Sequence, residues 1–171
     1  MFSALLDTCV LVPSRARDVL LEVASTGACR PLWSSEILAE LDRTLRLLPG
    51  KRGVSPEETD AYLTRLFRQM ATAFPDALVT AARFGRADVI VTDNLADFPP
   101  AALPAPLTRQ SLDEFLLDAL GLHPGLIISA VRAVAGPTGR TGPVMTARDI
   151  AVYLQVHGTP AFSERLLAEL G

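Results

Sequence analysis

Two short apolar runs most constrain the fold of this chain, because each ends against acidic side chains. Residues 4–12 (ALLDTCVLV) lack the three- to four-residue spacing of an amphipathic helix, which predicts a buried strand. Residues 87–92 (ADVIVT) predict a second strand, which runs directly into Asp93 and Asn94. Helical periodicity fills most of the sequence between them. The order strand, helices, strand, helices favours an α/β fold with a parallel sheet.

Helical periodicity before residue 110 falls into four segments. The clearest helix start is Ser55, which is followed by Pro56 at the first helical position and by Glu58, the partner in a capping box. The predicted helices cover residues 14–25, 33–48, 55–74 and 76–85.

The sequence changes character after the proline-rich stretch 98–107 (FPPAALPAPL). Ser111 and Glu114 form a second capping box at the start of an amphipathic segment. Further helices are predicted at 124–134, 146–156 and 160–170, with a Gly/Pro-rich segment between the first two. We therefore expect a domain at residues 1–110 and a helical C-terminal subdomain at 111–171.

Composition excludes several classes of protein. The chain has 171 residues and a formal net charge of -3, so it lacks the basic footprint of a general DNA-binding protein. Cys9 and Cys29 are too few for a zinc site and predict a reducing, cytoplasmic setting. Asp7 interrupts what would be the apolar region of a signal peptide, and no later stretch is long enough to span a bilayer.

The acids at the two strand ends point to a metal. Ligands of open parallel sheets bind outside the carboxyl ends of the strands, where Asp7, Asp93 and Asn94 would lie. Clustered carboxylates repel one another unless a cation lies between them. Oxygen ligands of this kind suit Mg²⁺ or Mn²⁺.

Two acids on predicted helices could join this cluster. At about 100° per residue, Glu40 lies at the edge of the apolar stripe of its helix, whereas Glu36 faces solvent. Asp76 lies at the start of the predicted helix 76–85, where a carboxylate also favours the helix dipole.

The segments LLDTCVL, WSSEILAEL and ADVIVTDNLADFP resemble those of PIN-domain ribonucleases, specifically the VapC toxins of bacterial toxin–antitoxin pairs. The middle segment, together with DEFLLDAL and the later helices, is similar to a VapC subgroup with an extra helical C-terminal region. The resemblance implies a PIN-like fold and a Mg²⁺- or Mn²⁺-dependent endoribonuclease. It also implies an RNA substrate, a cognate VapB-like antitoxin and a homodimer.

The resemblance also assigns the site. Asp7 matches the first acid of the family, Glu40 the second, and Asn94 a position that is often Asp or Asn. The region of the third acid is shorter here by about two dozen residues than in similar proteins, which leaves Asp76 and Asp93 as nearly equal candidates. Asp7 with Asp76, Asp93 or both would hold the metal, helped by Asn94. Glu40 would hold a second metal or position the attacking water.

A second departure from the family pattern is Cys9, where the family usually has an Asn that supports the first acid. A thiol is a weaker hydrogen-bonding partner. The alternative function is therefore a degenerate PIN-like module that binds RNA or an antitoxin without cleavage. A phosphohydrolase of the haloacid-dehalogenase type would need an Asp at position 9. Arg15, Arg17 and Arg43 could contact RNA phosphates or belong to a solvated face.

Overall fold

A computed structural model of the chain describes residues 2–48, 54–79, 86–138 and 143–171. Within them, five strands form one parallel sheet in the order β3–β2–β1–β4–β5. The strands are β1 (Ser3–Leu6), β2 (Arg30–Ser34), β3 (Leu78–Val79), β4 (Val89–Val91) and β5 (Thr108–Gln110). The helices are α1 (Thr8–Leu11), α2 (Ser14–Ser25), α3 (Ser35–Leu47), α4 (Pro56–Ala73), α5 (Leu112–Leu122), α6 (Pro124–Ala135), α7 (Ala147–Val156) and α8 (Pro160–Leu170). The predicted fold class, α/β with a parallel sheet and a helical C-terminal region, is confirmed.

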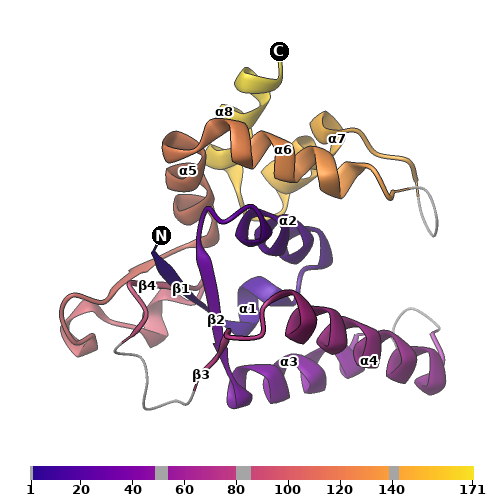
Figure 1. The fold of residues 1–171 in the computed structure, drawn as a ribbon, viewed down its shortest axis with the longest axis vertical. Helices are drawn as coiled ribbons and strands as arrows, with labels where there is room; N and C mark the ends of the chain where they lie inside the picture. Colours follow the sequence, from indigo (N-terminus) through magenta and orange to yellow (C-terminus); the bar gives the residue numbers. More distant parts are fainter. Residues whose placement is uncertain (1, 49–53, 80–85, 139–142) are drawn as a thin grey trace.

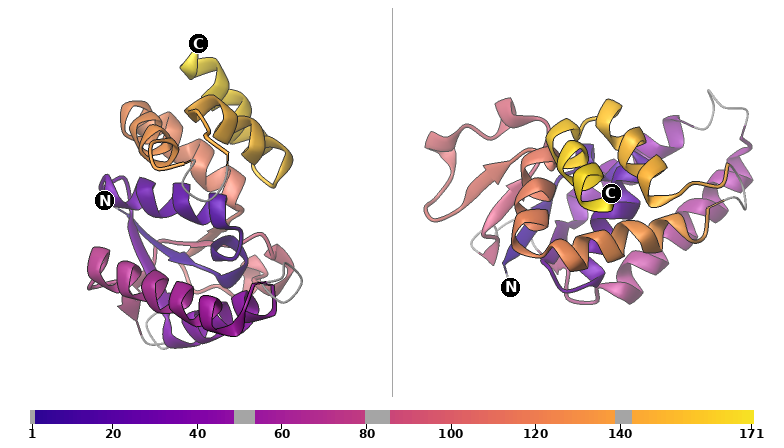
Figure 2. Two further views of the ribbon diagram at one scale, coloured as in Figure 1. Left: turned by 90° about the vertical axis from the view of Figure 1, so that its right-hand side faces the viewer. Right: turned by 90° about the horizontal axis from the view of Figure 1, so that it is seen from above.

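The helices lie in two groups around the sheet. Figure 1 shows α5 to α8 gathered at one end of the molecule and the pair α3 and α4 at the other, with α2 and the sheet between them. The left view of Figure 2, turned by 90° about the vertical axis, shows the same separation. The last third of the chain therefore packs against α2 rather than extending away from the sheet.

The larger hydrophobic core runs through both predicted domains. Leu6 of β1, Val19 of α2, Phe115 of α5 and Ile127 of α6 are at most 1% exposed and belong to this one cluster. The rings of Phe2 and Phe115 meet edge to face, with centroids 5.7 Å apart, across the same boundary. The division at residue 110 therefore stays a prediction, because the packing is continuous across it.

The opposite set of strand side chains forms a smaller core. Leu5, Leu32 and Ile90 lie on adjacent strands and alternate with the residues of the larger core, as the two faces of a pleated sheet require. Phe98 and Leu103 of the proline-rich stretch pack against them. This stretch thus covers one face of the sheet beside β4.

Local signals predicted the helices well. The predicted helix at residues 14–25 is α2, and the capping boxes at Ser55 and Ser111 are both formed, each with its Glu three residues later. The three later helices also start and end within one residue of the predicted bounds. Among the described residues no helix is long and apolar enough to cross a membrane.

The predicted strands and one helix need correction. The strand predicted at 4–12 ends at Leu6, because Asp7 caps a short helix, α1. The helix predicted at 76–85 is wrong over its first four residues, which form a turn and β3, and residues 80–85 lie outside the described residues. Trp33 and Ser34, predicted as helix, belong to β2. Both residues pair with β3, Trp33 with Leu78 and Ser34 with Val79, and local periodicity does not reveal this pairing.

Candidate functional site

The acids of the two apolar runs meet where the strand order reverses. β1 and β4 are neighbours, and the chain continues from β1 toward β2 on one side and from β4 toward β5 on the other. Asp7 follows β1 directly, and its backbone N–H donates to the carbonyl of Val91 at 3.1 Å. This is the edge of an open parallel sheet at which ligands bind in α/β proteins.

The carboxylate of Asp7 is fixed by three donors. Its Oδ1 accepts the backbone N–H of Thr8 at 2.8 Å, which makes Asp7 the N-cap of α1. Its Oδ2 accepts the hydroxyl of Thr92 at 2.7 Å and the thiol of Cys9 at 3.2 Å. Thr92 is fully buried and Asp7 is half-buried. The carboxylate therefore has a fixed orientation while one side of it stays open to solvent.

Cys9 connects the ends of β1 and β4. Its sulfur donates to Asp7 and accepts the backbone N–H of Asp93 at 3.3 Å. Burial is the main cause that raises the pKa of the Cys9 thiol, and the charge of Asp7 adds to it. The thiol therefore stays protonated at neutral pH and makes the kind of contact expected of an Asn, with a weaker donor.

Glu40 reaches the same point from α3. Ser34 caps this helix by accepting the N–H of Ile37 at 3.3 Å, which fixes where the helix begins. Glu40 is exposed, and its Oε2 accepts the hydroxyl of the buried Thr8 at 3.0 Å. The two carboxylates of Asp7 and Glu40 are thus linked through a single residue.

Asn94 belongs to the same network through its backbone. Its N–H donates to the Thr92 hydroxyl oxygen at 3.0 Å. Its side-chain amide donates to the carboxylate of Asp97, at the end of the short helix η3 (Leu95–Asp97). The amide of Asn94 therefore holds the turn after β4 instead of pointing at Asp7.

Asp93 lies at the same edge but has a partner of its own. Its side chain is exposed, and its Oδ1 accepts the backbone N–H of Leu112 at 3.0 Å. Leu112 is the first residue of α5, so the carboxylate holds the helix that opens the C-terminal region.

Asp76 lies apart from these residues. It is exposed, in the turn before β3. The register pairs Ser34 with Val79, and Ser34 lies level with Asp7 when the β1–β2 pairing is continued by two residues. Asp76 precedes β3 in a turn, at the end of that strand away from the level of Asp7, and β2 lies between β3 and β1. The structure therefore does not bring Asp76 together with Asp7.

The donor set can be tested against a divalent cation. No group of three or more His, Cys, Asp or Glu side chains in the described ranges is placed to hold a metal. Mg²⁺, however, keeps several of its waters and uses one or two protein carboxylates, with substrate phosphates as further ligands. The fixed carboxylate of Asp7 and the exposed carboxylate of Glu40 fit that pattern.

Arg17 is not a surface residue. Its side chain is 2% exposed, and its guanidinium donates to the carbonyl of Leu11 at 2.9 Å and to the hydroxyl of Tyr62 at 2.6 Å. It ties the end of α1 to α4 from inside the protein. The suggestion that Arg17 contacts RNA phosphates is therefore wrong, because no phosphate can reach it.

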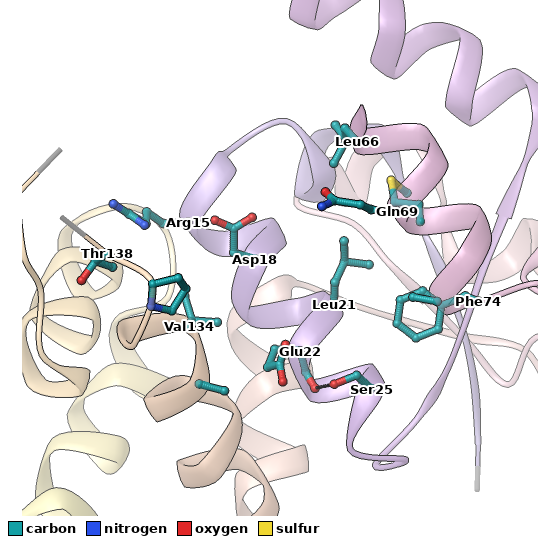
Figure 3. A pocket seen from close by; sticks show the side chains of 14 residues that line it. Arg15, Asp18, Leu21, Glu22, Ser25, Leu66, Gln69, Phe74, Val134 and Thr138 are labelled. Atoms are coloured by element: carbon teal, nitrogen blue, oxygen red, sulfur yellow. Dashed lines mark hydrogen bonds between the residues drawn. The ribbon is translucent and has the colours of Figure 1, made fainter. Parts of the chain in front are cut away.

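A groove of about 600 Å³ lies elsewhere, between α2, α4 and the end of α6 (Figure 3). Leu66, Met70, Phe74 and Val134 are among the apolar residues that line it. Asp18 on α2 also lines it, and burial raises the pKa of this carboxyl against the opposing effect of Arg17 and Arg15. None of the predicted acids of the site lines this groove, whose charged lining residues are Arg15, Asp18 and Glu22.

Two threonines of the site were not predicted from the sequence. Thr8 contacts Asp7 and Glu40, and Thr92 contacts Asp7, Cys9 and Asn94. Their positions were the only signal in the sequence. Thr8 follows Asp7 directly after β1, and Thr92 directly follows β4.

Comparison with known proteins identifies one part of the chain. Residues 112–168 match the family model described as the VapC50 C-terminal domain. No curated protein and no solved structure matches the chain. The matched segment covers α5 to α8 almost completely.

Proposed function

Since the VapC50 C-terminal domain at residues 112–168 indicates a VapC-family PIN-domain toxin with a C-terminal region, we propose that the chain is a Mg²⁺- or Mn²⁺-dependent endoribonuclease. Its coarse role is that of a toxin–antitoxin ribonuclease, with RNA as substrate and an antitoxin as partner. The proposal also includes metal-dependent cleavage, a VapB-like antitoxin, a homodimer and a cytoplasmic setting.

One observation carries the proposal. The carboxylates of Asp7 and Glu40 come from different elements and are joined through Thr8 at the edge where β1 and β4 diverge. A half-buried carboxylate with three donors is an arrangement that costs conformational freedom. A cation bound at that point would compensate the negative charges of the two carboxylates.

Each residue has a separate role in this proposal. A bound Mg²⁺ would lower the pKa of a water and stabilise the charge that develops on the scissile phosphate. Asp7 would hold the ion, because the hydroxyl of Thr92 and the backbone of Thr8 fix its orientation. Glu40 is exposed, so it can accept a proton from the attacking water or hold a second ion.

The second candidate function is a degenerate module that binds RNA or an antitoxin without cleaving. Two observations favour it. The carboxylate of Asp93 already accepts the N–H of Leu112, and a thiol stands at position 9. Both reduce the number of strong groups free to hold a cation.

The experiment that separates the two functions is metal removal. Purified protein, freed of its antitoxin, is incubated with a panel of structured RNAs in Mn²⁺, in Mg²⁺ and in EDTA. We expect cleavage with either ion and none in EDTA, with activity restored when Mn²⁺ is added in excess. Glu36→Gln serves as the control, because Glu36 is an exposed acid on the helix of Glu40. Binding of RNA without cutting under every condition identifies the degenerate module.

The third acid is a further prediction. We expect Asp76→Asn to leave the cleavage rate within about twofold of wild type. We expect Asp93→Asn to lower it by roughly tenfold, the smaller end of the range for residues that support a metal site. Rates are measured under single-turnover conditions, with thermal melts of both variants. A large loss in Asp76→Asn with no loss in Asp93→Asn contradicts the placement of the third acid beside Cys9.

A further inference from the structure

We propose that Thr8 is a positioning residue that holds the carboxylates of Asp7 and Glu40 together as one divalent-cation pair. The proposal rests on the nuclease function proposed above. It goes beyond it by assigning a role to a side chain that is neither acidic nor exposed.

Thr8 contacts both acids with different groups. Its backbone N–H donates to Oδ1 of Asp7 at 2.8 Å, and its hydroxyl donates to Oε2 of Glu40 at 3.0 Å. The residue is the first of α1 and is only 5% exposed. Two acids that are 33 positions apart in the sequence therefore meet at one buried residue.

The hydroxyl proton of Thr8 has two possible acceptors. The carbonyl oxygen of Ile37 lies 3.5 Å from the hydroxyl oxygen, and the carboxylate of Glu40 lies at 3.0 Å. The shorter distance and the negative charge both favour Glu40, because hydrogen bonds to ionised acceptors are shorter and stronger. The hydroxyl of Thr8 therefore donates its proton to Glu40 and not to the carbonyl of Ile37.

Glu40 depends on this bond for its orientation. It is exposed on α3, and a free glutamate at such a position occupies several rotamers. A donor fixed in the buried α1 selects the rotamers that lie beside Asp7. The bond uses one oxygen of Glu40 and leaves the other oxygen free for a cation or a water.

Substitutions of Thr8 separate the hydroxyl from the shape of the side chain. Thr8→Val keeps the branched shape and removes the donor, whereas Thr8→Ser keeps the donor and removes a methyl group. Thr59→Val is a matched control. Thr59 is 6% exposed, and its hydroxyl donates to the Ser55 carbonyl at 3.0 Å, within α4 and outside the network of Asp7.

The test measures Mn²⁺ binding by electron paramagnetic resonance and, separately, single-turnover RNA cleavage. The proteins are wild type, Thr8→Val, Thr8→Ser, Glu40→Ala, the double variant Thr8→Val/Glu40→Ala, and Thr59→Val. We expect Thr8→Val to lose roughly tenfold or more in Mn²⁺ affinity and in rate, as for other groups that orient metal ligands. Thr8→Ser should recover most of that loss. Thr8→Val should add nothing in the Glu40→Ala background, because Ala has no acceptor for the hydroxyl.

Each other result overturns the proposal in a recognisable way. Equal losses in Thr8→Val and Thr8→Ser, or a Thr8→Val loss that persists in the Glu40→Ala background, indicate a packing role only. Normal Mn²⁺ binding and cleavage by Thr8→Val also overturn it, while the nuclease function stands. A wild-type protein that neither binds Mn²⁺ nor cuts RNA overturns the proposed function and this inference with it.

Discussion

Asp7→Asn is expected to lower the rate of metal-dependent RNA cleavage by at least about a hundredfold. The change removes the negative charge that would hold the cation, and a bound ion contributes several kcal/mol to stabilising a transition state of this kind. A loss of about 2.7 kcal/mol corresponds to a hundredfold in rate. The measurement is single-turnover cleavage at saturating Mn²⁺, with Mn²⁺ affinity measured on the same preparations.

The fold should survive this substitution. Asn is as good an N-cap as Asp, so the bond to the N–H of Thr8 is retained. Asp88→Asn is the matched control, because the Asp88 carboxylate also accepts a backbone N–H, from Ser3 at 2.7 Å, at the other end of the same sheet. Cleavage by Asp7→Asn at the rate of Asp88→Asn would contradict the assignment of Asp7.

Phe115→Ala is expected to reduce the free energy of unfolding by about 3–5 kcal/mol, the usual range for a buried Phe. The ring is 1% exposed, and it meets Phe2, which precedes β1, edge to face. The substitution therefore opens a cavity where α5 packs against Phe2, in the larger hydrophobic core. Urea unfolding is followed by far-ultraviolet circular dichroism and by the fluorescence of Trp33, which lies in the sheet.

The same experiment tests how separate the two predicted domains are. Because one core includes Leu6, Phe115 and Ile127, both signals should shift together in a single transition. Leu122→Ala is the control: Leu122 is on the same helix but 65% exposed, and its loss should cost less than about 0.5 kcal/mol. If Phe115→Ala lowers the transition of the helices and leaves that of Trp33 unchanged, residues 111–171 form an independent unit.

Local chemistry made most of the helices predictable from the sequence. Capping boxes such as Ser55 with Glu58 act within four residues, so a short window contains the whole signal. β3 and β5 are two and three residues long and exist because they pair with β2 and β4. A window of sequence contains no trace of that pairing, which explains why these strands were missed.

Some residues of the candidate site could likewise be predicted from the sequence, and others could not. Asp7 stood out because a charge inside an apolar run is hard to explain as surface charge. The choice between Asp76 and Asp93 as third acid stays a prediction, to which the fold adds that Asp76 precedes β3, at the end of that strand away from Asp7. The hydroxyl of Thr8 donates to Glu40, 32 positions away, and that of Thr92 donates to Asp7, 85 positions away. The role of these hydroxyls can therefore be recognised only in the folded structure.

The packing of α6 against α2 has a consequence for synthesis of the protein. A ribosome that has produced residues 1–110 has already made every acid of the candidate site. The apolar side of α2, with Val19 and Val23, lies in the same core as residues such as Ile127 and Val131, which are translated later. A message cut or a ribosome stalled before that point leaves an uncovered apolar helix face. The larger hydrophobic core is therefore completed only when the residues of α5 to α8 have been translated.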